Sequence, residues 1–352
     1  MHPAPNETLH LVALGQSLIE HDLRFLRDDH LEQLVVHLTA DVCFSNLEVA
    51  IKDRLAGQPT KEGLYFHAAS PVVLDCLKDL GVNLLALCSN HAWDLGTKGI
   101  VATIHKARER GFVHAGTGKT ILEAAAPAYL RTTKGIVALV AMASGALASQ
   151  AIATDDRAGV NELRLGQDGT LNTRDVERNL DSIQSAASQA DCVVVYQHSH
   201  YLEPDRQQTP SWQQHWARLC IDAGATMFVG HGAPLLHGME LYKNCPIFYN
   251  LGNFIFHTRT PPGHYERSVW ESILVDCHFQ NARLSSLALY PLALSEGILG
   301  DHFYQTRGVP RLAEGEKGQS ILERFARMSR TFGVDMRIVG NSAHVEIQPW
   351  KS

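Results

Sequence analysis

Residues 84–96, which read LLALCSNHAWDLG, constrain the fold of this chain more than any other stretch. The first half, residues 84–88, is short, apolar and unbroken, which is typical of a central parallel strand that is buried on both faces. Polar residues follow where this strand ends, and from Lys98 the apolar residues recur with helical spacing. Such a strand–helix transition places the polar groups at the carboxyl edge of a parallel sheet, where open α/β sheets bind their ligands. The pattern predicts an α/β protein with a functional site at this edge.

Three polar residues after this strand have complementary chemistry. Asn90 can supply a neutral oxygen ligand to a metal, His91 can transfer a proton, and Asp94 can hold the imidazole in place. Any one of them alone would more often belong to a polar turn or a helix cap. Their combination, and similar groups after three other predicted strands, favours a functional site.

The composition is ordinary for a globular protein and argues against a role in nucleic-acid binding. Apolar residues make up 45% of the 352 residues, charged residues 19%, and the formal net charge is −6, whereas a nucleic-acid-binding surface would be strongly basic. No apolar run reaches the roughly 18 residues of a membrane span. The N-terminal segment lacks the cationic and apolar regions of a secretory signal. We therefore expect a cytoplasmic protein.

The cysteines and histidines differ in what they predict. The seven cysteines lie mostly within apolar runs and none forms a CxxC pair, so we expect buried, reduced thiols. The 19 histidines are more than a chain of this length usually carries, and several follow predicted strands. Because of this excess of histidines, we expect the protein to bind a metal.

Hydrophobic patterns predict further elements along the chain. Strands are predicted at residues 9–15, 42–44, 136–141, 192–196 and 226–229, and helices at residues 30–38, 71–80, 176–190 and 212–223. The GTGKT motif at residues 116–120 lacks the leading glycine of a phosphate-binding loop and is predicted to be a turn. Residues 144–169 lose periodicity and are expected to form an excursion or lid, and residues 246–256 to form paired strands around Gly252.

The C-terminal part has a different pattern. Beyond Val269, strands at residues 273–279 and 284–292 follow one another without a helix, which predicts an antiparallel sheet packed on the first. A helix near residues 321–328 and a last strand near residues 336–347 complete the chain. We expect one domain over residues 1–352, with a core at 9–256 and the elements at 269–348 completing the second sheet.

Four predicted strand ends carry groups that can bind a metal. These are Glu48, Asn90, His198 and His231. One carboxylate, one amide oxygen and two imidazoles form a mixed oxygen and nitrogen set that suits Mn, Fe or Zn. The residues arrive on separate strands, so their spacing in sequence is irregular while their convergence in space is natural.

The same residues carry a resemblance to a known family. Residues 46–48 (NLE), residues 89–91 (SNH) with Asp94 and Gly96, His198, residues 230–231 (GH) and residues 248–254 (FYNLGNF) resemble the CapA (poly-γ-glutamate capsule synthesis) family. That family belongs to the calcineurin-like metallophosphoesterase superfamily, and the match runs in order over about residues 9–256. The resemblance implies a four-layer α/β/β/α sandwich with two mixed sheets and a metal site at the strand ends.

Two departures from the family pattern affect the expected metal content. The first strand of the family usually ends in Gly-Asp, and here Gln16 follows the glycine; a second histidine usually follows Gly-His, and here Pro234 stands at that position. Sites of the superfamily hold two metals. These two positions supply ligands to one metal, whereas Glu48, Asn90, His198 and His231 match the ligands of the other metal. Gln16 carries no charge and Pro234 no ligand, so we predict one divalent metal (Mn, Fe, Zn or Ca) per chain. His200, His21, Asp22 or His237 could supply replacement ligands.

The leading functional hypothesis is a metal-dependent enzyme in which His91, held by Asp94, acts as general acid or base. With one metal, chemistry at a carbonyl centre is easier to support than ordinary phosphodiester hydrolysis. Some CapA-like proteins resemble peptide epimerases of lasso-peptide pathways, and Cα proton exchange would fit the site. Cys88 and His200 are candidate groups for the opposite face of the substrate. The expected substrate is a peptide, a γ-glutamyl compound or another small anion.

Two alternatives stay open. One is a non-catalytic CapA-type accessory protein of poly-γ-glutamate or capsule synthesis, in which the site is a structural remnant. The other is a phosphoesterase with replacement ligands. The sequence carries no prediction of an oligomeric state.

Overall fold

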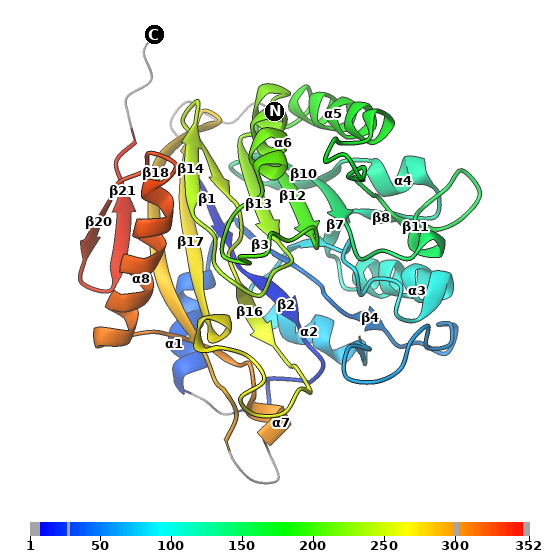
Figure 1. Ribbon diagram of the computed structural model, residues 1–352, viewed down its shortest axis with the longest axis horizontal. Helices are drawn as coiled ribbons and strands as arrows, with labels where there is room; N and C mark the ends of the chain where they lie inside the picture. The colour runs from blue at the N-terminus through cyan, green and yellow to red at the C-terminus, as the bar shows by residue number, and fades with distance from the viewer. Residues whose placement is uncertain (1–7, 27–28, 299–302, 348–352) are drawn as a thin grey trace.

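A nine-stranded mixed sheet forms the first layer of strands in the computed structural model, which describes residues 8–26, 29–298 and 303–347 (Figure 1). Its strands are β1 (Thr8–Ala13), β3 (Val42–Asn46), β6 (Leu84–Ala86), β7 (Val113–Ala115), β17 (Glu271–Gln280), β18 (Arg283–Leu294), β19 (Pro310–Leu312), β20 (Met336–Val339) and β21 (Ser342–Val345). The order is β20-β21-β18-β17-β1-β3-β6-β7, with β19 paired to β18. Strand β6 lies between β3 and β7 and runs parallel to both, so the predicted central parallel strand is confirmed.

A six-stranded mixed sheet forms the second layer. It contains β9 (Ala128–Thr132), β10 (Gly135–Ser144), β12 (Cys192–Ser199), β13 (Met227–His231), β14 (Met239–Tyr242) and β15 (Cys245–Phe248). Its four inner strands are parallel, and β9 and β14 pair antiparallel at the two edges. Three short two-stranded pairs border these sheets: β2 (Gln16–Leu18) with β16 (Asn253–Phe256), β4 (Ala50–Ile51) with β5 (Ala68–Ala69), and β8 (Thr117–Gly118) with β11 (Gly159–Val160).

Helices cover the sheets. They are α1 (Asp29–Leu38), α2 (Val72–Asp79), α3 (Gly96–Glu109), α4 (Ile121–Ala125), α5 (Thr173–Ala187), α6 (Ser211–Asp222), α7 (Phe303–Thr306) and α8 (Gly315–Arg330), with short 3₁₀ helices η1 (Ser149–Ala151) and η2 (Arg267–Trp270). The helices predicted at residues 30–38, 71–80, 176–190 and 212–223 are confirmed within a few residues at their ends. The helix predicted near residues 321–328 begins earlier, at Gly315. Among the described residues, no helix combines the length and the apolar character that crossing a bilayer requires.

Two hydrophobic cores hold the layers together. The first lies between the sheets, where Phe44 of β3 meets the ring of Tyr196 of β12 edge-on, with 5.5 Å between ring centroids. Helices α1, α2 and α3 also contribute buried side chains to this core. The second lies under α5 and α6, where Val193 and Val195 of β12 pack with Trp216. Successive side chains of β12 therefore point alternately into the first and the second core. The expected four-layer α/β/β/α sandwich with two mixed sheets is confirmed.

The predicted arrangement of the C-terminal strands is wrong. Strand β17 pairs antiparallel with β1, and β18 pairs with β17, so these strands extend the first sheet and do not form a separate one. Residues 246–256 likewise give β15 and β16, which belong to different sheets, because β16 pairs with β2. The last predicted strand is a hairpin of β20 and β21. Alternation predicts that a strand has a buried face, but it does not identify the neighbouring strand.

The core between the sheets gives a first stability prediction. Phe44 is fully buried, and Phe44→Ala removes its contact with Tyr196 and leaves a cavity. We expect the free energy of unfolding, measured in urea, to fall by about 3–5 kcal/mol. Phe25 is 83% exposed, so Phe25→Ala is the matched control and should change stability little. Equal losses in the two variants would contradict this view of the core.

Candidate metal and acid–base site

The carboxyl ends of strands from both sheets surround one cavity of about 450 Å³. The residues that line it include Gln16, Glu48, Lys61, Tyr65, His67, Asn90, His91, His200, Arg206, Gly232, Pro234, His264 and Tyr265. Glu48 follows β3, and Asn90 follows β6. His198 is the last residue but one of β12, whose neighbour β13 ends at His231. β3 and β6 are parallel neighbours in the first sheet, and β12 and β13 are parallel neighbours in the second, so each pair of ends lies at one edge of its own sheet. The contact between Asn90 and His198 shows that these two edges meet.

His198 lies at the centre of a group of potential metal ligands. Its Nε2 atom is 2.9 Å from Asn90 Oδ1, 3.7 Å from Glu48 Oε1 and 3.1 Å from His200 Nε2. The ligand atoms of Glu48, His198 and His200 all lie within 4.8 Å of one another. One imidazole N–H can satisfy only one of these three neighbours, whereas a cation can accept a lone pair from all of them.

Burial strengthens the case for a cation in this group. Glu48 is 3% exposed, and its Oε2 atom is buried without a hydrogen-bond partner. Burial raises the pKa of the Glu48 carboxyl to about 8, and the nearby Asp94 charge acts in the same direction. Burial also lowers the pKa of His198 well below its usual value and that of His200 to about 4, so both imidazoles are held in the neutral form that binds metals. The donor set therefore fits a divalent metal.

His231 contributes an imidazole of defined tautomer beside this group. Its Nε2–H donates to the carbonyl oxygen of Leu14 at 3.0 Å, which leaves a lone pair on Nδ1. That Nδ1 atom is buried and has no hydrogen-bond partner, and burial lowers the pKa of the ring to about 3. His231 is not in the tight group around His198. Tyr196 lies between the two histidines: its ring centroid is 5.1 Å from that of His231, and its hydroxyl contacts His198 Nδ1 at 3.2 Å.

The side chains of His91 and Asp94, which the sequence suggests as a proton-transfer pair, are in contact. His91 Nδ1 lies 3.0 Å from Asp94 Oδ2, and the Asp94 carboxylate also accepts hydrogen bonds from Lys61 Nζ at 2.8 Å and from the backbone N–H of His67 at 2.7 Å. Because a carboxylate only accepts, His91 carries its proton on Nδ1 and has a lone pair on Nε2. Burial lowers the pKa of His91 to about 4 against the opposing effect of Asp94.

A comparison of sequences identifies the family of this chain. The family model described as "Bacterial capsule synthesis protein PGA_cap" matches residues 27–258. The chain belongs to this family. The predicted resemblance to CapA proteins is thereby confirmed. Of the residues that carried it, Glu48, Asn90 and His91 line the cavity.

Relatives of this family member include proteins named for capsule biosynthesis and for polyglutamine synthesis. "Capsule biosynthesis protein CapA" of Bacillus anthracis is 29% identical over 263 residues, covering 73% of this chain and 59% of that protein. "Uncharacterized protein y4sH" of Sinorhizobium fredii is 27% identical over 93% of this chain and 91% of its own length. A "probable polyglutamine synthesis accessory protein" of Mycobacterium tuberculosis is 25% identical over 84% of this chain and 74% of that protein.

In this PGA_cap family member, the two departures from the family pattern line the same cavity. Gln16 Nε2 donates to Asn253 Oδ1 at 2.7 Å, and Gln16 Oε1 accepts from the backbone N–H of Gly232 at 3.2 Å. Both ends of the amide are therefore occupied by protein groups. Pro234 offers no side-chain ligand.

The suggested replacement ligands lie in different places. His200 joins the group around His198, as described above. The His21 ring is tilted against that of His257, with 5.2 Å between ring centroids, and Asp22 pairs with Arg24. Neither residue belongs to the metal-ligand group. His237 Nε2 contacts the carbonyl oxygen of Arg206 at 2.8 Å and is not a lining residue of the cavity.

Cys88 does not reach the substrate cavity. It is fully buried and does not line the cavity, and burial raises the pKa of its thiol. It packs so closely against Gly116 that a Cβ added there would lie 2.5 Å from the Cys88 Sγ. Of the two candidate groups for the opposite face of a substrate, only His200 lines the cavity.

Several residues of the site were not predicted from the sequence. Lys61 comes from a polar loop that gave no signal beyond its charge, and it contacts Asp94. His67 lies under His91 with ring centroids 4.6 Å apart, and its Nδ1 contacts Glu20 Oε1 at 2.7 Å. Arg206 adds a second cation to the cavity wall.

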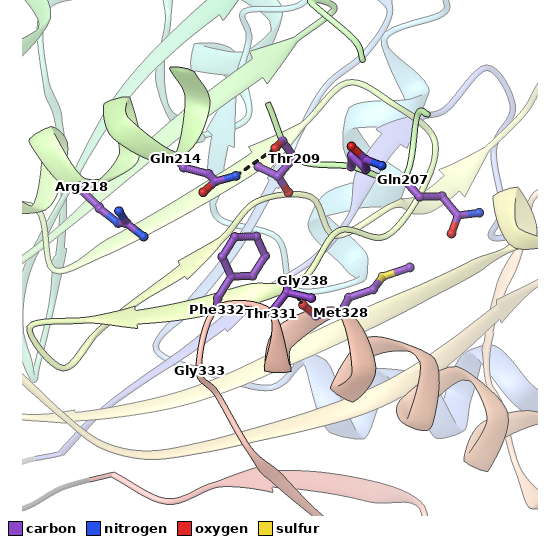
Figure 2. A pocket seen from close by; sticks show the side chains of 10 residues that line it. Gln207, Thr209, Gln214, Arg218, Gly238, Met328, Thr331, Phe332 and Gly333 are labelled. Atoms are coloured by element: carbon purple, nitrogen blue, oxygen red, sulfur yellow. Dashed lines mark hydrogen bonds between the residues drawn. The ribbon is translucent and has the colours of Figure 1, made fainter. Parts of the chain in front are cut away.

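A second cavity, of about 720 Å³, lies between α6 and the C-terminal end of α8 (Figure 2). Gln214 and Arg218 face it from α6, and Met328 and Phe332 from α8 and the residues that follow it. Its described lining contains no imidazole and no carboxylate, and Arg218 pairs with Glu240 at 3.0 Å. It therefore lacks the imidazole and carboxylate ligands and the acid–base groups of the first cavity.

Proposed function

We propose that this chain is a metal-dependent enzyme that performs acid–base chemistry at a carbonyl or phosphoryl centre of an anionic substrate, such as a peptide or γ-glutamyl compound, in a biosynthetic pathway. The reaction is either hydrolysis or Cα epimerisation. The observation that carries the proposal is that the ligand group around His198 and the oriented His91–Asp94 pair open into one cavity.

The residues of the chain have separate roles in this proposal. Glu48, Asn90 and His198 would hold the metal, with His200 or His231 as further ligands. A bound divalent metal supplies polarisation of a substrate carbonyl or phosphoryl oxygen. His91 takes or returns a proton at Nε2, and Asp94 keeps that tautomer and ring orientation.

The charge of the cavity supports an anionic substrate. Lys61 and Arg206 line it, and Glu48 is the one carboxylate among the described lining residues. Within the described part of the chain, Arg206 has no ion pair, so its guanidinium is available to a carboxylate or phosphate. The cavity volume of about 450 Å³ suits a small ligand or the end of a longer chain. The capsule-synthesis name of the Bacillus anthracis relative makes γ-glutamyl peptides the first candidates.

We propose one tightly bound metal, with the second site of the superfamily weak or lost. Gln16 stands at the position of a carboxylate ligand, and both ends of its amide are hydrogen-bonded to the protein. Without the second metal, the attacking and leaving oxygens of a phosphodiester would lose half of their electrostatic clamp. This favours a carbonyl-centred reaction.

One observation favours each alternative. The loss of metal ligands at Gln16 and Pro234, with the accessory-protein name of the Mycobacterium tuberculosis relative, favours a non-catalytic accessory role in polyglutamate synthesis. The contact of His200 with His198 favours a phosphoesterase with a replacement ligand. The imidazole of His91 is oriented by Asp94 and lines the same cavity. A purely structural site would not need this pair, so we favour the enzyme.

The deciding experiment is a substrate screen with the manganese-loaded chain and its His91→Ala variant. A γ-glutamyl oligopeptide is tested for hydrolysis and, in D₂O, for deuterium incorporation at Cα by mass spectrometry; an aryl phosphate is tested in parallel. We expect turnover of the peptide that is lost in His91→Ala. Turnover of the aryl phosphate alone would establish the phosphoesterase. No turnover, with an unchanged capsule phenotype for His91→Ala in cells, would establish the accessory role.

A further inference from the structure

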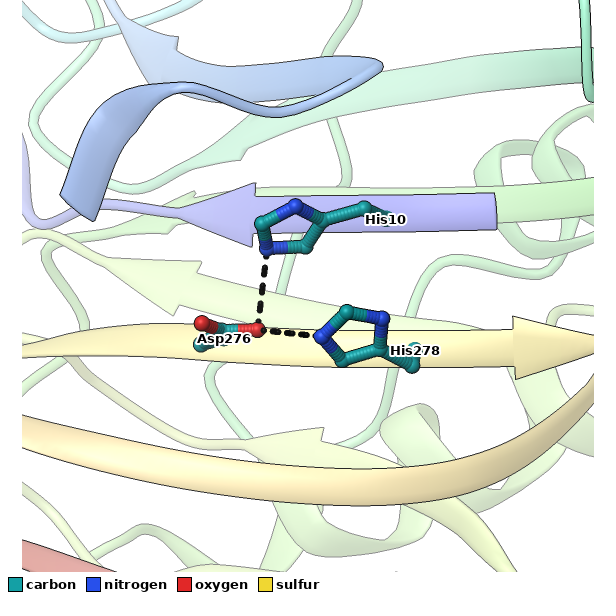
Figure 3. A group of neighbouring side chains, drawn as sticks. All are labelled: His10, Asp276 and His278. Atoms are coloured by element: carbon teal, nitrogen blue, oxygen red, sulfur yellow. Dashed lines mark hydrogen bonds and ion pairs between the residues drawn. The ribbon is translucent and has the colours of Figure 1, made fainter. Parts of the chain in front are cut away.

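A second group of metal-ligating side chains lies outside the cavity, on the partly exposed face of β1 and β17 (Figure 3). It consists of His10, Asp276 and His278. His10 precedes Gln16 by six residues of nearly extended chain, which corresponds to roughly 20 Å at about 3.3 Å per residue. The group is therefore separate from the site at the strand ends.

The pairing of the two strands brings these side chains together. His10 is directly opposite His278 in the antiparallel register, and Asp276 is opposite Val12. Residues two apart on a strand share a face, so the two histidines and the aspartate project from the same side of the sheet. The arrangement is held by the backbone of two central strands and does not depend on a loop.

The ligand atoms converge at distances close to those of a metal site. His10 Nε2 and His278 Nε2 lie 3.0 and 3.2 Å from the same atom, Asp276 Oδ1, and all three ligand atoms are within 4.8 Å of one another. The two imidazole rings are stacked, with 4.4 Å between centroids and 7° between planes. Ligand atoms at about 2.0–2.1 Å from a tetrahedral zinc ion lie about 3.3 Å apart, so small rotations of the side chains suffice.

The surroundings favour positive charge at this position. A second carboxylate, Asp41, accepts the backbone N–H of His10 at 2.9 Å. Two stacked imidazolium ions would repel each other, so protonation of both rings is a poor way to neutralise these carboxylates. A divalent ion bound between two neutral imidazoles and the Asp276 carboxylate would supply the positive charge without that repulsion.

We propose that His10, Asp276 and His278 bind a divalent transition-metal ion, with Zn²⁺ as the natural occupant, and that water fills the remaining coordination positions. Two imidazoles and one carboxylate suit zinc, whereas calcium and magnesium require more oxygen ligands. The ion would join β1, which begins the parallel half of the nine-stranded sheet, to β17, which begins its antiparallel half. Zinc binding would therefore stabilise the junction between the two halves.

The test compares zinc binding in two full-length proteins whose cavity site is disabled by Glu48→Gln and His198→Ala. One carries no further change, and the other also carries His278→Ala. Equilibrium dialysis should give one equivalent of Zn²⁺ in the first protein and none in the second, and added zinc should raise the melting temperature of the first protein alone. Co²⁺ serves as an optical probe, because its visible absorption reports the imidazole ligands.

Two further variants separate binding from folding. His105 contacts Glu109 at 3.2 Å, and among the described residues no third potential ligand joins this pair, so His105→Ala should leave zinc binding unchanged. Asp276→Asn keeps an acceptor oxygen and should weaken zinc binding while the apo-protein stays folded. Equal zinc binding with and without His278 would overturn the proposal and leave a hydrogen-bonded His–Asp–His cluster. If the cavity-disabled protein does not fold, the same one-equivalent difference is measured between the wild-type chain and His278→Ala.

Discussion

His198→Ala is expected to release the metal of the cavity and to end turnover. His198 Nε2 lies within hydrogen-bond distance of Asn90 Oδ1 and His200 Nε2, so its removal takes away the central ligand of the group. Even outer partners of metal ligands are worth about 10–100-fold in affinity, so we expect the affinity for Mn²⁺ to fall by more than about 100-fold. Equilibrium dialysis followed by elemental analysis measures the effect.

The matched control is His237→Ala. His237 is nearly as buried as His198, but its Nε2 atom contacts the carbonyl oxygen of Arg206 and lies outside the ligand group. The His237→Ala variant should therefore retain the metal. The difference in bound manganese between the wild-type chain and His198→Ala should be one equivalent. A difference of two would show that the cavity holds two metals despite Gln16 and Pro234, and no difference would refute the ligand assignment.

The elements that carry the site could be predicted because their signals are local. The apolar run before Asn90 and the apolar run before His198 each predict a buried strand, and both are parallel strands inside a sheet. In a parallel sheet the carboxyl ends share one edge, so polar residues after separate strands could be assigned to one site without knowledge of the strand order. Local pattern and this rule pair Glu48 with Asn90 and His198 with His231, whereas the meeting of the two sheet edges is seen only in the structure.

Features that depend on distant pairing could not be predicted. The alternation in β17 predicts a half-buried strand, but its partner β1 is more than 250 residues away, and no local pattern identifies that partner. The hydrogen bond of Gln16 could not be predicted for the same reason, because its acceptor, Asn253 Oδ1, is 237 residues away in the sequence. Lys61 reaches Asp94 from a loop whose composition predicts only exposure to solvent. The His10 group depends on the β1–β17 pairing in the same way.

His91→Ala is expected to reduce kcat by about 10²–10⁴-fold while the cavity metal stays bound. The reason is that His91 is not in the ligand group, whereas its Nδ1 contact with Asp94 fixes the ring and leaves Nε2 free for proton transfer. Metal content after dialysis and steady-state turnover of the substrate identified in the screen are measured on the same preparation. Loss of activity together with loss of metal would instead mean that His91 helps to hold the ion.

Two further variants distinguish proton transfer from packing in the cavity. Asp94→Asn should also lower kcat, because an amide can donate to His91 Nδ1 and favour the opposite tautomer; it also weakens the contact with Lys61. His264 lines the same cavity, where it contacts the Tyr65 hydroxyl at 3.4 Å, and it has no carboxylate partner in the described structure. His264→Ala should therefore change KM more than kcat. An equal fall in kcat for His264→Ala and His91→Ala would show that loss of any cavity imidazole is harmful, and the assignment of proton transfer to His91 would then fail.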